Sequence, residues 1–123
     1  VRFGPINWKN QAVQKKNQQA ECVFSGNVYV LNSADSFSAA MDFATLLSDN
    51  GLCMVVGEIP GNMPSSYGDI LYFQTPNALL AFTVSYKYFI RPDASKSDLP
   101  LLPDVQVPAD NALEEALRLI QKD

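Results

Sequence analysis

Ser38 is the residue of this sequence whose type and position best suit nucleophilic chemistry. It lies in "SADSFSAAMDFATLLSDNG" (33–51), where an apolar pattern of helical spacing begins at Phe37. A serine in the first turn of a helix lies beside free backbone N–H groups, at the positive end of the helix dipole, and such donors can stabilise an oxyanion. First-turn serines are also common for capping reasons. The position alone therefore leaves a nucleophilic and a structural role open.

The sequence contains no histidine, which is the commonest general base and the commonest metal ligand. Its two cysteines, Cys22 and Cys53, are too few for a disulfide framework, and without histidine they are too few for a zinc site. Both are predicted to be buried thiols. The sequence therefore predicts no zinc site, and no metal or organic cofactor is implied.

Several other polar residues invite a functional interpretation beside a structural one. Glu58 follows a predicted strand and is either catalytic or an acid satisfied by loop N–H groups. Asp49 is either a supporting site residue or a helix-end residue. Lys87 and Lys96 are predicted surface charges, with a lysine reaching Ser38 from a neighbouring segment as the alternative. The aromatic residues Tyr67, Tyr72, Tyr86, Tyr88 and Phe89 are predicted to pack within a hairpin rather than form a binding stripe.

Composition narrows the class of protein. With 123 residues, of which 47% are hydrophobic, the chain fits one globular domain or a piece of a larger one. A net charge of -4 argues against a nucleic-acid partner. Residues 1–23 hold four Lys or Arg against one Glu, a net charge of +3, which leaves −7 for the remainder. We interpret 1–23 as a polar linker or lead-in segment and 24–123 as the folded part.

No apolar run approaches the roughly 20 residues of a membrane-spanning helix, so no span is expected. No signal peptide is visible, and the sequence starts at Val1 rather than at a methionine. We therefore expect a piece of a longer protein, with a trimmed tag or a mature N-terminus as the alternatives.

The elements that must position Ser38 form a strand–helix–strand unit of the mixed α/β class. Strands are predicted over 28–31 and 52–58, with a helix between them over 37–49. Ser36 is the expected N-cap, and Gly51 stands where a left-handed C-cap belongs. The helical stripe consists of Phe37, Ala40, Met41, Ala44 and Leu47. This order predicts a crossover between parallel strands.

The second half of the chain predicts a hairpin and a final helix. After a Pro/Gly loop over 59–69, strands over 70–74 and 79–89 form an antiparallel pair. Four prolines between 90 and 110 predict an extended surface segment. The last helix is expected to begin with Asp110 as N-cap and to carry an apolar stripe of Leu113, Ala116, Leu117 and Ile120.

Six motifs in order resemble the C-terminal processing (tail-specific) serine protease family over about 24–109. They are a Val-rich strand, a helix start at 36–40, Asp49–Asn50, Gly57–Glu58, Tyr67–Gly68 and a late Pro-Asp-x-x-Val segment at 103–107. The resemblance implies that Ser38 is the nucleophile and that the Ala39 N–H contributes to the oxyanion hole. It also implies that the chain is the C-terminal part of a ClpP/crotonase-like superhelix of β-β-α units.

The sequence departs from the best-known branch of that family, which uses a lysine as general base. Counting from Ser38 places Met63 at the lysine position, and aligning on Tyr-Gly places Asp69 there. The chain is more similar to the tricorn-core-like branch, which uses serine, histidine and a carboxylate. That resemblance implies Asp98, or less well aligned Asp93, as the carboxylate, with the histidine supplied from upstream.

The resemblance implies a serine-type endopeptidase that hydrolyses peptide bonds through an acyl-enzyme on Ser38, while the isolated chain is expected to be inactive. Its expected partners are a polypeptide substrate and the upstream part of its own protein. The exposed faces of such a piece are compatible with a homo-oligomer, and family analogy implies an exported, extracytoplasmic protein. The alternative is a non-catalytic peptide- or protein-binding module on the same fold.

Overall fold

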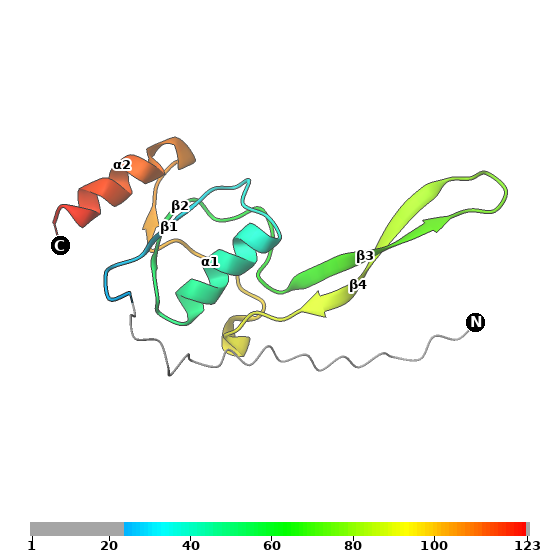
Figure 1. Ribbon diagram of the computed structural model, residues 1–123, viewed down its shortest axis with the longest axis horizontal. Helices are drawn as coiled ribbons and strands as arrows, with labels where there is room; N and C mark the ends of the chain where they lie inside the picture. The colour runs from blue at the N-terminus through cyan, green and yellow to red at the C-terminus, as the bar shows by residue number, and fades with distance from the viewer. Residues whose placement is uncertain (1–23, 123) are drawn as a thin grey trace.

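The computed structural model describes residues 24–122, which form a small α/β unit and a projecting β-hairpin (Figure 1). The predicted lead-in segment and Cys22 lie outside the described residues. The elements in chain order are β1 Tyr29–Asn32, α1 Ala39–Asp49, β2 Met54–Gly57, β3 Ser66–Gln74, β4 Ala81–Phe89, the 3₁₀ turn Ala94–Lys96, β5 Val105–Gln106 and α2 Ala109–Ile120. No helix within 24–122 has the length and apolarity that crossing a bilayer requires.

The predicted strand–helix–strand crossover is confirmed. Strands β1 and β2 pair in parallel, with Leu31 opposite Val56, and α1 connects them. Val55 and Val56 are fully buried, because helices α1 and α2 both pack on this strand. On α1 the buried residues are Met41, Ala44 and Thr45, so part of the predicted stripe faces the core.

The remaining residues of the predicted α1 stripe are not buried in the core. Leu47 is half-buried, whereas Phe37 and Ala40 are exposed. Helix α1 begins at Ala39 rather than at 37, so Phe37 precedes the helix and is not held on its buried face.

The start of α1 corrects one prediction and its end confirms another. Ser38, not Ser36, is the N-cap, and its side chain makes no capping hydrogen bond. The Ser36 hydroxyl instead accepts a hydrogen bond from the Ser33 N–H at 3.1 Å, so the predicted capping role was wrong. At the other end Gly51 has φ +64, and the N–H groups of Gly51 and Leu52 reach back to the carbonyls of Ser48 and Leu47. This pattern is a Schellman motif, which the left-handed glycine permits.

Strand β5 was not predicted, because it is only two residues long and lies among prolines. It pairs in parallel with β2, which makes a sheet of order β1-β2-β5. The preceding Asp104 carboxylate accepts a hydrogen bond from the Val55 N–H at 2.7 Å and so extends this attachment. Nearby Cys53 is a free, half-buried thiol rather than a fully buried one, and burial, followed by the Asp104 charge, raises the pKa of that thiol.

Helix α2 begins two residues earlier than predicted, with Pro108 as N-cap and Asp110 in its first turn. Asp110 as N-cap was therefore wrong. The buried side chains of α2 are Ala112 and Ala116, which pack on Val56. Three of the four residues in the predicted stripe, Leu113, Leu117 and Ile120, are exposed. The helix packs on the sheet through its small alanines instead, and Ala116 is the one stripe residue among them.

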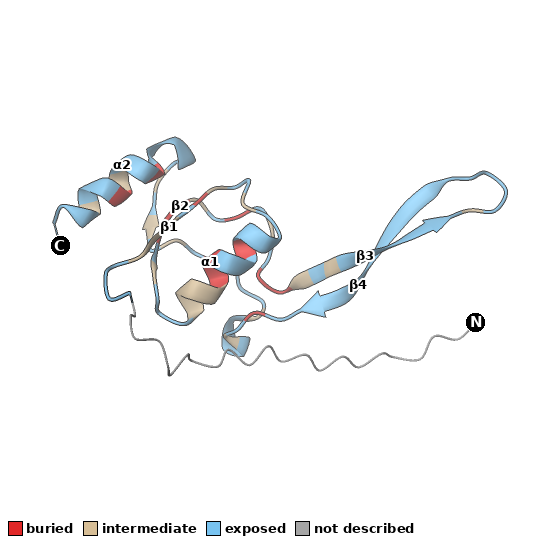
Figure 2. Ribbon diagram, viewed as in Figure 1, coloured by how far each residue is buried: buried red, intermediate tan, exposed pale blue. Residues whose placement is uncertain are grey.

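Strands β3 and β4 form the predicted antiparallel hairpin, with β3 beginning four residues earlier than expected. The hairpin extends away from the rest of the unit (Figure 1), and almost all of it is exposed (Figure 2). Tyr67 and Tyr88 contact each other across the strands, with ring centroids 4.9 Å apart, as the packing interpretation predicted. Tyr72, in contrast, is 78% exposed, because the described residues place nothing over it.

Candidate active site

Ser38 adopts a backbone conformation that is unusual for a residue with a side chain. Its φ is 53° and its ψ is -122°, in a region that glycine tolerates and other residues rarely adopt. The residue is exposed and lies between the end of β1 and the first turn of α1. Its carbonyl accepts the Asp42 N–H at 2.9 Å, so the strained residue is joined directly to the helix. Strain of this kind persists only where the surroundings impose it, and it is concentrated at functional sites.

The Ala39 N–H is the donor that the structure leaves available beside Ser38. Within the described residues neither this N–H nor the Ser38 hydroxyl forms a hydrogen bond. The N–H belongs to the first residue of α1, where the helix dipole favours negative charge. The arrangement can therefore stabilise an oxyanion formed next to Ser38, but the described residues offer the hydroxyl no general base.

Glu58 ties the connection after β1 to the start of α2. One carboxylate oxygen accepts the Ala34 N–H at 3.0 Å and the other accepts the Ala109 N–H at 3.1 Å. These two hydrogen bonds hold the pKa of the Glu58 carboxyl below its usual value. Both oxygens are occupied by backbone donors, which corresponds to the structural interpretation of Glu58.

Asn62 hydrogen-bonds to Ser38, whereas the predicted supporting acids Glu58 and Asp49 bond to other residues. Its Oδ1 accepts the Ser38 N–H at 3.2 Å, and the preceding Gly61 donates its N–H to the Ser36 carbonyl at 3.3 Å. Sequence reasoning missed Asn62. The only signal was its place in the Pro/Gly loop, which indicates a turn but not what the turn contacts.

Asp49 is buried at the opposite end of α1 from Ser38. Its carboxylate pairs with Arg91 at 2.7 Å and also accepts the Asp93 N–H at 3.1 Å. Burial raises the pKa of the Asp49 carboxyl, but the hydrogen bonds from Arg91 and Asp93 outweigh it and the pKa is lowered. Asp49 is thus a helix-end residue, as the structural alternative predicted, and its partner Arg91 was not anticipated.

Asp98 is exposed and lies shortly after the 3₁₀ turn. It makes no hydrogen bond or ion pair within residues 24–122, and no contact joins it to Ser38. The alternative, Asp93, is engaged locally: it accepts hydrogen bonds from Ser95 and pairs with Lys96 at 3.1 Å. Of these two acids, Asp98 is the one that remains available to an external partner.

The two lysines considered as bases are both paired with acids. Lys87 pairs with Asp69, at one of the two positions where the best-known branch of the family would place its lysine, and Lys96 pairs with Asp93. The pairing raises the pKa of Lys87. Neither lysine contacts Ser38. The described residues also contain no cluster of three or more side chains suited to hold a metal ion.

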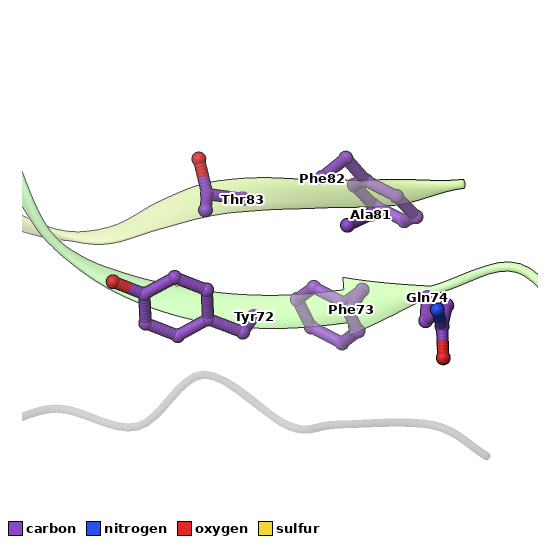
Figure 3. A pocket seen from close by; sticks show the side chains of 6 residues that line it. All are labelled: Tyr72, Phe73, Gln74, Ala81, Phe82 and Thr83. Atoms are coloured by element: carbon purple, nitrogen blue, oxygen red, sulfur yellow. The ribbon is translucent and has the colours of Figure 1, made fainter. Parts of the chain in front are cut away.

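An open hollow lies on the distal part of the hairpin (Figure 3). It contains none of the predicted site residues, and within it the rings of Phe73 and Phe82 stack at 5.4 Å. The residues around it are Tyr72, Phe73, Gln74, Ala81, Phe82 and Thr83.

An exposed serine with a strained backbone, in a strand-to-helix connection and followed by an N–H that has no partner among the described residues, is arranged like the nucleophile elbow of serine hydrolases. Comparison with known proteins agrees with this class. Residues 4–107 match peptidase family S41, and the chain belongs to that family. The resemblance to C-terminal processing peptidases, drawn from the six motifs, is thereby confirmed. No curated protein matches the chain.

Among solved structures, the chain is similar to the crystal structure of mature CPAF, with a TM-score of 0.56 and 22% sequence identity. The similarity covers 80% of this chain but only 20% of that one, so the chain spans about a fifth of the length of its structural neighbour. At this identity the likeness shows a shared fold, which is consistent with the mixed α/β prediction.

Proposed function

We propose that this chain is the C-terminal part of the catalytic domain of a serine endopeptidase, with Ser38 as the nucleophile. The observation that carries the proposal is the strained backbone of Ser38, an exposed residue at the N-terminus of α1. Membership of peptidase family S41 supports polypeptides as the substrate class.

The proposed reaction divides the work between this chain and the upstream part of the protein. The Ser38 hydroxyl attacks the scissile carbonyl while an upstream histidine takes its proton, and that histidine then protonates the leaving amine. The Ala39 N–H and an upstream glycine N–H stabilise the tetrahedral oxyanion. Water, deprotonated by the same histidine, then hydrolyses the acyl-enzyme and regenerates Ser38.

Asp98 is the proposed carboxylate that orients this histidine. A residue in that role contacts the base and not the nucleophile, so the lack of contact between Asp98 and Ser38 is compatible with it. Its exposure and the absence of a local partner among the described residues support the assignment.

The test is labelling of the longest natural form of the protein with a fluorophosphonate probe. We expect one label, on Ser38, that is lost in Ser38→Ala and kept in the control Ser85→Ala, which removes an exposed hairpin hydroxyl. The isolated 123-residue chain should label poorly and hydrolyse no peptide, because it contains no histidine. A well-folded longest form that does not label would favour the non-catalytic binding module instead.

A further inference from the structure

Three hydrogen bonds hold the serine-bearing connection, residues 33–38, against the loop that follows β2. The Ala34 N–H donates to Glu58, the Gly61 N–H donates to the Ser36 carbonyl, and the Ser38 N–H donates to Asn62 Oδ1. The third bond is the only one of these that acts on the strained residue itself.

The orientation of the Asn62 amide is fixed at its other end. Its Nδ2 donates to the Met63 carbonyl at 3.3 Å, which leaves Oδ1 facing the Ser38 N–H at 3.2 Å. The side chain is half-buried, so it is partly held by packing as well as by hydrogen bonds. An acceptor held in this way favours the one backbone conformation of Ser38 that presents its N–H to the loop.

We propose that Asn62 is a positioning residue that holds Ser38 in its strained conformation. The inference rests on the proposed role of Ser38 as nucleophile. It has a second consequence for the oxyanion: because the Ser38 N–H is engaged by Asn62, the donor that this chain contributes is the Ala39 N–H. Asn62 itself acts on the reaction only through the geometry of Ser38.

The test compares Asn62→Leu, which removes the acceptor at similar size, with Asn62→Asp, which keeps an oxygen at the same place. Asn77→Leu makes the same chemical change in the exposed turn of the hairpin and serves as the control. Three quantities are measured in the longest natural form: the fluorophosphonate inactivation rate kinact, the probe affinity KI, and the hydrogen-exchange rate of the Ser38 amide. Thermal unfolding confirms that each variant is folded, and Asn62→Ala replaces Asn62→Leu if the latter is not.

In Asn62→Leu we expect kinact to fall roughly 10- to 100-fold with KI little changed, since misplacing a reacting group affects the reaction rather than binding. The Ser38 amide should exchange roughly fivefold faster or more, because its hydrogen bond is lost. Asn62→Asp should recover part of both changes, because it keeps the acceptor for the Ser38 N–H but loses the donor to the Met63 carbonyl, whereas a merely structural residue would not show this acceptor-dependent rescue.

An unchanged kinact or an unchanged Ser38 exchange rate in Asn62→Leu would overturn the role of Asn62 alone. Equal losses in Asn62→Leu and Asn62→Asp would overturn it as well. A different outcome tests the role of Ser38 as nucleophile. This outcome is a folded wild-type protein whose Ser38 amide is protected from exchange but whose Ser38 is not labelled. The proposed function would then fail, and the positioning role of Asn62 would fail with it.

Discussion

Arg91 and Asp49 form a buried ion pair that joins the end of α1 to the segment after β4. The two side chains are 4% and 2% exposed, and the guanidinium also donates to the carbonyls of Leu99 and Pro100. One arginine therefore holds the helix and the segment that carries Asp98 in a fixed relation. Neither partner contacts Ser38, so the pair organises the fold around the candidate site without taking part in it.

Asp49→Asn should lower the free energy of unfolding by about 3–5 kcal/mol, because it leaves the Arg91 charge buried without a counter-charge. The exposed pair of Lys87 and Asp69, on the hairpin, provides the control, and Lys87→Met should leave stability nearly unchanged. Urea denaturation followed by circular dichroism measures both. Equal effects of the two substitutions would contradict a dominant role of the buried pair.

The same pair should make stability depend on pH on the acidic side. The pKa of Asp49 is lowered in the folded state, so its contribution is fully present above the unfolded-state pKa, about 3.9, and is lost as the pH falls through the lower folded-state pKa. The decline in unfolding free energy between pH 6 and pH 2 should therefore be shallower in Asp49→Asn than in the wild type. Glu58 and Asp93, whose pKa values are also lowered, should keep the decline from vanishing. Parallel curves for the two proteins would refute this assignment.

Ser38→Gly should be more stable than Ser38→Ala by roughly 1 kcal/mol. A φ of 53° with a ψ of -122° strains any residue that has a Cβ, and glycine removes that strain at a smaller entropic penalty. Thermal unfolding of the two variants measures the difference, and both should fail to label with fluorophosphonate. If Ser38→Gly is the less stable variant, the backbone of Ser38 is not strained in solution.

Gly57→Ala should destabilise the protein by more than about 3 kcal/mol, whereas Gly51→Ala should lower stability by about 1 kcal/mol. A Cβ on Gly57 would lie 1.9 Å from the Asn32 carbonyl oxygen, so β1 and β2 would have to separate. Both glycines have a positive φ, +133° at Gly57 and +64° at Gly51, but a Cβ on Gly51 would meet nothing within 4 Å. Chemical denaturation measures the free energy of unfolding of both variants. A much larger loss in Gly57→Ala than in Gly51→Ala would show that the close approach of β1 to Gly57 matters more than the positive φ.

The spacing of apolar and turn-forming residues along the sequence predicted three features of the fold correctly. The crossover between β1 and β2, the Gly51 helix end and the β3–β4 hairpin each follow from patterns within segments of about 30 residues or fewer. The start of α1 was misplaced by two residues, because Ser36 and Ser38 suit an N-cap equally well. In the folded chain the two serines differ in their contacts: the Ser36 hydroxyl accepts the Ser33 N–H, whereas the Ser38 N–H donates to Asn62.

The sequence by itself determined the nature of the protein: a mixed α/β chain of the S41 kind, with a serine at a helix start and no histidine in the sequence given. The tertiary structure decided what surrounds that serine. It imposed the strained backbone of Ser38. The hydrogen bonds from Ser38 to Asn62, from two backbone N–H groups to Glu58 and from Arg91 to Asp49 join residues that are 24 to 51 positions apart in the sequence. Periodicity and turn propensity act between near neighbours, so contacts over such separations appear only when the chain has folded.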